Sequence, residues 1–566
     1  MRARRLVLLA GLALALARAG FAQTPVPQPL QDPGDRLLRE EAARERRERL
    51  EQEPARIEGG ERAPRAAAQE AVESIAEPGP SFLIERIVLD GDNVLRAAAV
   101  RAIVDPFTGR QLGANRINRL LERLNQAFVE WGLITTRAYV REQNLAAGTL
   151  TVTVVAGRIE VLEYEGRPLE PGGWDRPAVR LAFPTAAGDV LRLQDLEQGV
   201  DQMNRLRRNR TEVQIQPGET PGGSRVSIRN PQGDRFYYSL GADNSGSEPT
   251  GLHRVRAGVE ANDLLGLQDA LALSFVGTQD SNALLFSAAV PVGYHTLSYL
   301  YSYAEFQNLV ADTAILFGTT RNQVFDWSMV LGRSARGVSN LDLSLGLRRA
   351  TREIGPIQLA PQRLTVLRAG YSRLQRVQSG AAPGFWVLDL GLSRGLDVLG
   401  ANRDPDDLPG GVPRAQFTKF DFGASLGVPI PRSAWNVRTA AAGQWSRDAL
   451  YGSEQIFIGG AATVRGFAEA ALSGDRGAYL RNEAAPGALA GLLGEGVVFQ
   501  PFLFADAGTT QFAASGPWRS LVGAGAGARA TTRFMAAEVV LAWPLYHPDA
   551  LPDVGFRIHA TLNVVF

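Results

Sequence analysis

The stretch FRIHATLNVVF, residues Phe556 to Phe566, alternates strictly between apolar and polar side chains. Its apolar face carries Phe556, Ile558, Ala560, Leu562, Val564 and Phe566. Its polar face carries Arg557, His559, Thr561 and Asn563. A strand that lies between lipid and a water-filled lumen requires this period of two. The stretch therefore predicts a membrane-spanning strand, and the aromatic Phe566 is predicted to be the closure signal where the last strand of a barrel meets the first.

Further segments between residues 234 and 566 carry a similar alternation. They are Tyr237–Asp243, Arg254–Val259, Leu271–Val276, Leu284–Val290, Leu297–Tyr303, Val324–Leu331, Asp342–Arg348, Leu364–Tyr371, Trp386–Leu392, Phe417–Leu426, Val437–Trp445, Ala478–Glu483, Val497–Phe504, Leu521–Arg529 and Phe534–Trp543. With the terminal strand they make about 16, an even number as bacterial outer-membrane barrels prefer. An open sheet of that size has to curl or split. Residues 234–566 are therefore predicted to form a closed transmembrane β-barrel.

The amino-terminal residues and the composition limit the compartment and the chemistry. Three arginines within the first five residues precede the apolar run Leu6–Ala17, and Gly20 and Ala22 offer a cleavage site, which predicts a signal peptide over residues 1–22. The chain has no cysteine, which excludes disulfides and thiolate sites. Its net charge of +1 gives no footprint for nucleic-acid binding.

Residues 23–80 are rich in proline, glutamate and arginine and are predicted to contain one helix, Asp35–Glu53. The pairs Glu40/Arg44 and Glu45/Arg49 lie four residues apart in the favourable order, at about 0.2–0.5 kcal/mol each. Two interpretations stay open. The helix either belongs to a solvated tether or occupies a water-filled channel, where a charged surface all round carries no penalty.

Two similar α/β units follow, at residues 81–157 and 158–231. Each is predicted to hold a strand, an apolar-striped helix and two more strands, an internal repeat of about 75 residues. The predicted elements of the first unit are the strand Phe82–Leu89, the helix over residues 117–131 and the strands Thr135–Val140 and Thr149–Val155. Those of the second are the strand Ile159–Tyr164, the helix over 193–203 and the strands Thr211–Gln216 and Ser224–Arg229. The helix stripes are predicted to be core, and function is expected at a sheet edge, where an extended peptide can pair.

A long glycine- and alanine-rich loop, residues 448–475, separates two predicted barrel strands and contains the run GGAATVRGF, Gly459–Phe467. Its few charges predict that it folds inward, and Arg465 then needs a carboxylate partner. Asp506 is the candidate, because it shares one face of the strand segment Phe502–Gly508 with Phe502 and Phe504, and lipid does not tolerate a carboxylate at depth. We expect water in the lumen to screen this pair, so that its energy lies below that of a fully buried ion pair.

Two short motifs in this region resemble the paired signature of the Omp85 superfamily. They are Val464-Arg465-Gly466-Phe467 and Phe504-Ala505-Asp506-Ala507-Gly508. Further stretches resemble the two-partner-secretion branch, the ShlB/FhaC/HecB-like haemolysin secretion/activation transporters: Gly474–Glu483, Asp243–Ser247 and Asp195–Leu206. The run Arg207–Asn209 departs from the Pro-Ser type of turn expected in that family. The resemblance covers roughly residues 32–566.

The resemblance implies a transmembrane β-barrel with two periplasmic POTRA-like domains and an N-terminal plug helix. It implies that Arg465, on an inward-folded loop, pairs with Asp506 on the inner barrel wall, either as a structural latch or as part of the conduction path. It also implies that the protein translocates a large, unfolded, β-rich exoprotein, haemolysin- or adhesin-like, with an N-terminal secretion domain. The other implied partners are outer-membrane lipid and the barrel-assembly machinery, and no cofactor is implied.

Alternative functions remain at this stage: a barrel insertase of the same superfamily, a diffusion porin and an outer-membrane hydrolase. Insertases usually carry more periplasmic repeats than two, and a porin has no need of residues 82–229. A catalytic or metal site is not expected, because the four histidines are scattered and no Gly-x-Ser-x-Gly elbow accompanies them. The run Gly523–Ala528 lacks the lysine of a phosphate-binding loop, and its glycines are expected to relieve crowding in the barrel wall.

Overall fold

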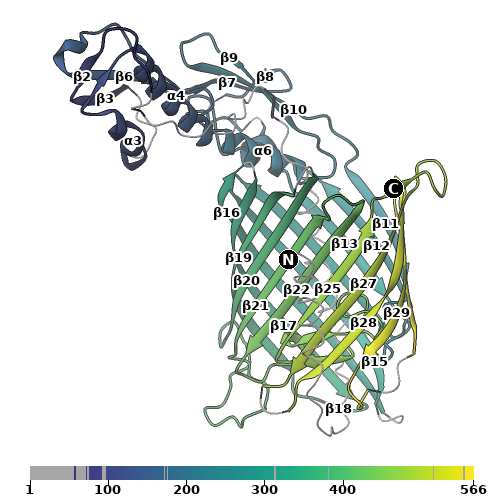
Figure 1. Cartoon of the computed structure of the whole chain (residues 1–566). Helices are drawn as coiled ribbons and strands as arrows, with labels where there is room; N and C mark the ends of the chain where they lie inside the picture. The colour runs from purple at the N-terminus through teal and green to yellow at the C-terminus, as the bar shows by residue number, and fades with distance from the viewer. Residues whose placement is uncertain are drawn as a thin grey trace, which may run out of the picture.

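The computed structural model describes residues 57–58, 72, 75–91, 97–170, 172–174, 176–310, 314–334, 336–379, 382–513, 516–551 and 555–566. The predicted signal peptide and the predicted helix Asp35–Glu53 lie outside these residues. Two small α/β units stand at one end of a large closed barrel (Figure 1). Among the described residues, no helix has both the length and the apolarity to cross a membrane.

The first unit is built on a three-stranded sheet in the order β3-β6-β5. Its elements are β2 (Phe82–Ile84), β3 (Arg86–Gly91), α3 (Ala97–Val104), β4 (Arg110–Leu112), α4 (Ala114–Glu130), β5 (Arg137–Tyr139) and β6 (Thr149–Val155). The apolar stripe of α4 lies in the core as predicted, with Leu120, Leu124 and Phe128 fully buried. The single predicted strand Phe82–Leu89 is wrong: β2 pairs with β4, whereas β3 pairs with β6. The chain changes partner at Glu85, so one apolar run serves two sheets.

The second unit has a five-stranded sheet in the order β1-β9-β10-β7-β8. Its elements are β1 (Ile57–Glu58), β7 (Arg158–Tyr164), β8 (Arg167–Pro168), α5 (Pro177–Ala182), α6 (Leu193–Asn204), β9 (Glu212–Pro217) and β10 (Gly223–Arg229). Leu196, Val200 and Met203 of α6 are buried against the sheet, as predicted. The short helices α3 and α5 were not predicted, because neither is long enough to display several turns of a helical stripe.

The barrel contains 16 long antiparallel strands, which confirms the predicted number. They are β11 (Phe236–Asp243), β12 (Arg254–Asn262), β13 (Ala270–Gly277), β14 (Ser281–Val292), β15 (His295–Val310), β16 (Ala314–Ser334), β17 (Gly337–Ile354), β19 (Gln362–Ser379), β20 (Ala382–Leu396), β21 (Thr418–Pro429), β22 (Trp435–Ser446), β25 (Arg476–Pro486), β27 (Val498–Gln511), β28 (Arg519–Thr531), β29 (Met535–Tyr546) and β30 (Arg557–Val565). Two short strands, β18 (Ile357–Gln358) and β26 (Leu489–Ala490), pair within connections. Several strands extend beyond their predicted ends, because alternation weakens there.

The barrel closes between its first and last strands, β11 and β30. The backbone of Phe566 exchanges hydrogen bonds of 2.8 and 3.0 Å with Tyr238, and the two rings stack with centroids 6.1 Å apart. On β30, Ile558 and Leu562 are exposed on the outside, so the apolar face points outward as predicted. The position of Phe566 at this seam agrees with a role in closure.

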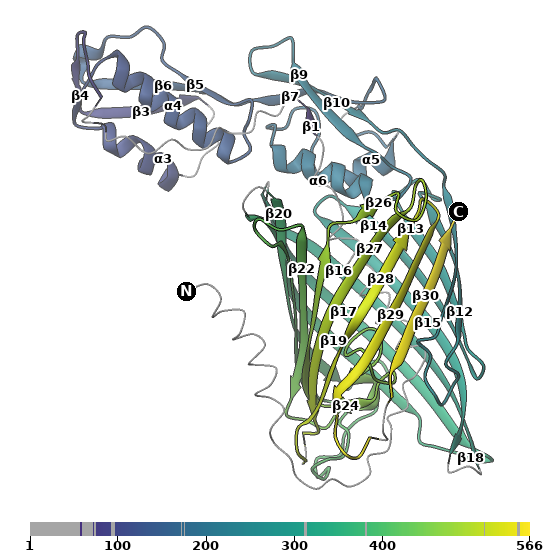
Figure 2. The same cartoon turned by 45° about the vertical axis from the view of Figure 1, so that its right-hand side comes forward.

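The second unit lies over one end of the barrel, which we call the proximal end, and the first unit extends beyond the rim (Figure 2). The hairpin containing β18 lies at the opposite, distal end (Figures 1 and 2). Helix α6 contacts the proximal turn between β14 and β15, where Gln198 Nε2 and Gln202 Nε2 donate to the Gly293 carbonyl at 2.9 and 3.1 Å. The second unit is therefore tied directly to the barrel.

Candidate functional site

The loop 447–475 connects the neighbouring strands β22 and β25 from the distal end, and it folds back into the barrel. Inside, β23 (Ile456–Ile458) pairs with β24 (Leu472–Gly474) and forms a hairpin. The residues at its tip pack on one another and on the barrel wall in one buried apolar cluster: Ile458, Val464, Phe467, Ala471, Leu472 and Leu521. Because the loop has its own apolar core and few charges, it folds inward, as its composition predicts.

The Asp475 carboxylate accepts hydrogen bonds at the base of this loop. This contact was not predicted from the sequence. Its Oδ1 accepts hydrogen bonds from the Leu450 amide at 2.8 Å and from Gln455 Nε2 at 3.1 Å. Its Oδ2 accepts from the Ala513 amide at 2.8 Å. The carboxylate is 2% exposed, and it joins the two ends of the loop to the connection that follows β27. Asp475 belongs to the run Gly474–Glu483, which resembles the family in sequence. The three donors that bind it come together only in the folded chain.

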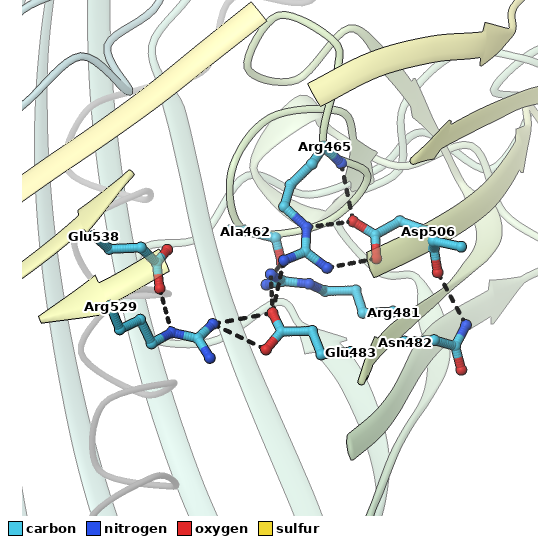
Figure 3. A network of polar contacts seen from close by, with 9 residues as sticks. Ala462, Arg465, Arg481, Asn482, Glu483, Asp506, Arg529 and Glu538 are labelled. Carbon is cyan, nitrogen blue, oxygen red and sulfur yellow. Dashed lines mark hydrogen bonds and ion pairs between the residues drawn. The ribbon is translucent and has the colours of Figure 1, made fainter. Parts of the chain in front are cut away.

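The structure places Arg465 directly against Asp506 on β27 (Figure 3). Arg465 Nε donates to Asp506 Oδ2 at 2.6 Å, and Nη2 donates to Oδ1 at 2.8 Å. The Arg465 backbone amide adds a third hydrogen bond to Oδ2 at 3.2 Å. This bidentate geometry with an extra backbone donor is among the strongest arrangements for an arginine and a carboxylate.

The pair is not screened by water, so the expectation of a solvated pair is wrong. Arg465 and Asp506 are each only 1% exposed. Phe504 lies on the same face of β27, with its ring centroid 3.8 Å from the guanidinium carbon, and the Phe502 ring is 5.9 Å away. These two rings and the loop itself exclude solvent. Removing Arg465 therefore leaves Asp506 as a buried unpaired charge, which typically costs about 3–5 kcal/mol.

Glu483 on β25 is a second carboxylate partner of Arg465, which the sequence interpretation missed. It accepts from Arg465 Nη1 at 2.6 Å and from Arg529 Nη2 at 2.9 Å, and Arg481 lies 3.6 Å away (Figure 3). Arg529 in turn pairs with Glu538 at 2.5 Å. With Asp506, three arginines meet three carboxylates, so the network is balanced in formal charge. Glu483 lies two residues after Arg481, so the two side chains lie on the same face of the strand. This spacing was the sequence feature that could have identified Glu483.

Glycines make room where the loop tip meets the wall. Gly466 has a φ of +98°, which favours glycine, and a Cβ there would lie 3.0 Å from the Trp543 carbonyl carbon. A Cβ on Gly508 would meet Val464 Cγ2 at 2.9 Å. A Cβ on Gly523 would lie 1.9 Å from the Arg465 carbonyl oxygen. Gly523 belongs to the run Gly523–Ala528. Part of that run therefore provides space for the loop tip, in addition to relieving crowding among the strands.

The remaining predicted site residues divide into two places. Val464 and Phe467 are fully buried in the loop cluster, and the Phe467 ring meets His547 edge to face at 6.4 Å. Phe566 lies at the barrel seam, apart from the arginine network. Within the described residues, no group of three or more histidines and carboxylates has a geometry that could hold a metal ion.

A second polar cluster joins α6 to the proximal rim of the barrel. Arg333 on β16 pairs with Asp201 at 2.6 Å, and the Tyr294 hydroxyl donates to Asp195. Burial raises the pKa of the Asp201 carboxyl, and the Arg333 charge offsets this only in part. Burial likewise raises the pKa of the Asp195 carboxyl, against the smaller opposing effect of the Tyr294 hydrogen bond.

The turn Arg207–Asn209, which departs from the family pattern, is fixed in the same junction. The Arg207 guanidinium lies over the Tyr237 ring at 4.6 Å. Arg208 is 8% exposed, donates to Gln232 Oε1 at 2.9 Å and lies 3.9 Å from the Asp263 carboxylate. The two arginines thus attach the end of α6 to the barrel beside a tight turn, in which the Asn209 amide donates to the Leu206 carbonyl at 3.0 Å.

Similarity to known proteins identifies the family to which this chain belongs. Residues 222–530, more than half of the chain, match the family described as haemolysin secretion/activation protein ShlB/FhaC/HecB. The chain belongs to this family. Residues 82–157 match the ShlB-type POTRA domain, and residues 158–217 match a POTRA domain. The chain is therefore an outer-membrane transporter of the two-partner secretion type, with its POTRA domains in the periplasm. The proximal end of the barrel is the periplasmic end, and the distal end is extracellular.

Several relatives are similar over most of their length. The outer membrane transporter CdiB of Escherichia coli O6:K15:H31 is 29% identical over 554 residues, which cover 95% of this chain and 92% of that protein. The hemolysin transporter protein ShlB of Serratia marcescens is 28% identical, with 89% of each chain covered. The solved structure of CdiB from Escherichia coli superposes with a TM-score of 0.82 at 27% identity, covering 95% of this chain and 100% of that chain. CdiB from Acinetobacter baumannii shares the fold, with a TM-score of 0.77 at 18% identity and the same coverage.

Proposed function

We propose that this transporter carries a large, unfolded, β-rich exoprotein through its barrel, and that Arg465 positions the loop 447–475 as part of the conduction path. The observation that carries this proposal is the buried contact of Arg465 with Asp506 and Glu483 inside the barrel. A loop of this size, held in the lumen by the Arg465 ion pairs and by its buried apolar cluster, lies where an exported chain has to pass. The loop must therefore rearrange during transport.

The network allows such a rearrangement at a limited cost. If Arg465 leaves, Glu483 still faces Arg481 and Arg529, so its charge stays compensated. Asp506 is the one carboxylate of the network that loses its ion-pair partner. Water that enters with the moving loop solvates Asp506, which lowers the penalty for its charge. The Arg465–Asp506 ion pair is thus strong when the loop fills the lumen and weak when water enters the lumen.

We propose that the POTRA domains capture the N-terminal secretion domain of the exoprotein by strand addition. The sheet of the second unit has its β9 edge paired with Ile57–Glu58, so a client strand has to displace that segment to pair there. The first sheet ends in β3 and β5, and β3 offers six residues against the three of β5. Strand β3 is therefore the better candidate for the first contact with the client.

We propose that residues 1–22 serve as a signal peptide and that the helix predicted at Asp35–Glu53 acts as a plug that leaves the lumen before export. The POTRA-like domains span 81–157 and 158–231, and the barrel spans 234–566. The barrel-assembly machinery inserts the protein, and the chain itself catalyses no reaction and uses no cofactor.

The test is to co-express the chain with its exoprotein partner and to measure exported protein in the medium. Arg465→Ala should reduce export strongly, while the amount of inserted barrel, measured by resistance to unfolding in cold detergent, stays near the wild-type level. Arg368→Ala is the matched control, because Arg368 forms a 2.7 Å pair with Asp421 on the lumen wall and does not touch the loop. Full export by correctly inserted Arg465→Ala protein would show that the loop contact has no part in transport.

A further inference from the structure

Three arginines form a row across neighbouring strands on the outer surface of the barrel. In the strand register, Arg321 on β16 lies opposite Arg349 on β17, and Arg349 lies opposite Arg363 on β19. All three are exposed, whereas their strand neighbours Thr320, Arg348 and Leu364 are buried on the lumen side. The three guanidinium groups therefore project outward, toward the membrane.

This row lacks a counter-charge within the part of the protein that the structure describes. Like charges that face each other across strands are destabilising. The Arg321 guanidinium lies over the Tyr303 ring at 5.7 Å, a contact that does not neutralise it. The outward carboxylates Glu305 and Glu353 lie farther toward the extracellular end, and neither forms an ion pair with the row among the described residues. An external anion is the remaining way to relieve the repulsion.

The row lies at the height of the extracellular headgroups. Between Ser339 and Arg349 on β17, the outward positions are all leucine: Leu341, Leu343, Leu345 and Leu347. Ten residues of a strand tilted by roughly 40° rise about 25 Å, which matches the height of the apolar band of a bacterial barrel. Ser339 is close to the periplasmic turn that precedes β17, so it marks the inner boundary of this band. Arg349 then lies at the outer boundary.

We propose that Arg321, Arg349 and Arg363 bind the phosphate groups of the phosphorylated glucosamine lipid, lipid A, of the outer leaflet. Each guanidinium offers a planar fork of donors that matches a phosphate in a bidentate way. Adjacent arginines can share one phosphate or hold two, which converts their mutual repulsion into attraction. The inference rests on the outer-membrane location and is independent of the role of the loop in export.

The experiment uses the full chain purified and reconstituted in phosphatidylcholine nanodiscs with a graded content of bisphosphorylated lipid A. Retention of lipid A in the purified discs is measured by mass spectrometry. The variant Arg349→Gln/Arg363→Gln should retain it about thirtyfold less well, because each of the two charges removed near the membrane surface contributes about fivefold. Dephosphorylated lipid A should not distinguish the variant from the wild type.

Arg373→Gln is the matched control. Arg373 lies on the same strand and the same face as Arg363, ten residues closer to the periplasm, and its guanidinium already contacts Gln375 at 2.9 Å and the Trp386 ring at 6.0 Å. This control should retain lipid A as the wild type does. Equal retention by the wild type and the double variant would overturn the proposal. Equal retention of phosphatidylglycerol by the wild type, in parallel discs that contain it in place of lipid A, would overturn the assignment to the outer-leaflet lipid.

Discussion

Gly523→Ala tests whether the barrel wall was shaped to receive the loop tip. The added Cβ would lie 1.9 Å from the Arg465 carbonyl oxygen, so this oxygen has to retreat by more than about 1 Å to reach an ordinary contact distance. The same peptide region carries the 3.2 Å hydrogen bond from the Arg465 amide to Asp506. Overpacking of this kind typically costs about 1–3 kcal/mol. The substitution therefore strains the latch without removing any of its charged groups.

The absence of cysteine in the chain makes a thiol assay specific. Val464→Cys places one thiol in the loop cluster, where Val464 is fully buried. An increase of about 1–3 kcal/mol in the energy of the closed loop raises the open fraction about 5- to 150-fold. Gly523→Ala should accordingly accelerate labelling of this thiol by a maleimide that does not cross membranes. Ala524→Val, which adds volume to the lipid-facing side of the same strand, is the control and should leave labelling unchanged.

Gly523 does not hold the loop tip in place if Gly523→Ala protein inserts normally, labels no faster than its parent and exports its partner at the wild-type rate. That result would mean that the loop tip shifts within its seat without loosening. Loss of the folded barrel itself would be visible as a loss of heat-modifiable migration.

Three other substitutions test the remaining contacts. Arg529→Gln should lower the free energy of unfolding by no more than about 1 kcal/mol, because Arg529 is partly exposed and Glu483 keeps two arginines; a loss comparable to that of Arg465→Ala would contradict this. Burial raises the pKa of Asp195, so the stabilisation linked to its protonated form is lost as pH rises above about 4 through the raised value. Asp195→Asn, whose amide oxygen still accepts from Tyr294, should flatten that part of the pH dependence of unfolding in calorimetry; an unchanged profile argues against it. Phe566→Ala removes the ring at the barrel seam and should reduce the yield of heat-modifiable barrel, whereas an equal yield would exclude a role in closure.

The barrel strands were predictable from the local alternation of polarity along the sequence. Alternation identified all 16 long strands, because each residue on a barrel strand faces either lipid or lumen and its polarity reports which. The same alternation failed at the ends of β16 and β17, which extend past the predicted segments. Outside the lipid there is no constraint on the outward side chains, so the periodic signal fades although pairing continues.

Local sequence was enough to predict the barrel, the two α/β units and the two residues of the ion pair, Arg465 and Asp506. These follow from the polarity of single side chains along one strand or loop, which is a local property. The folded chain was needed to see that the pair is buried away from water, that Glu483 also binds Arg465 and that Gly523 leaves space for the loop tip. Burial and the sharing of a carboxylate depend on atoms from four separate segments, and no local pattern encodes their distances.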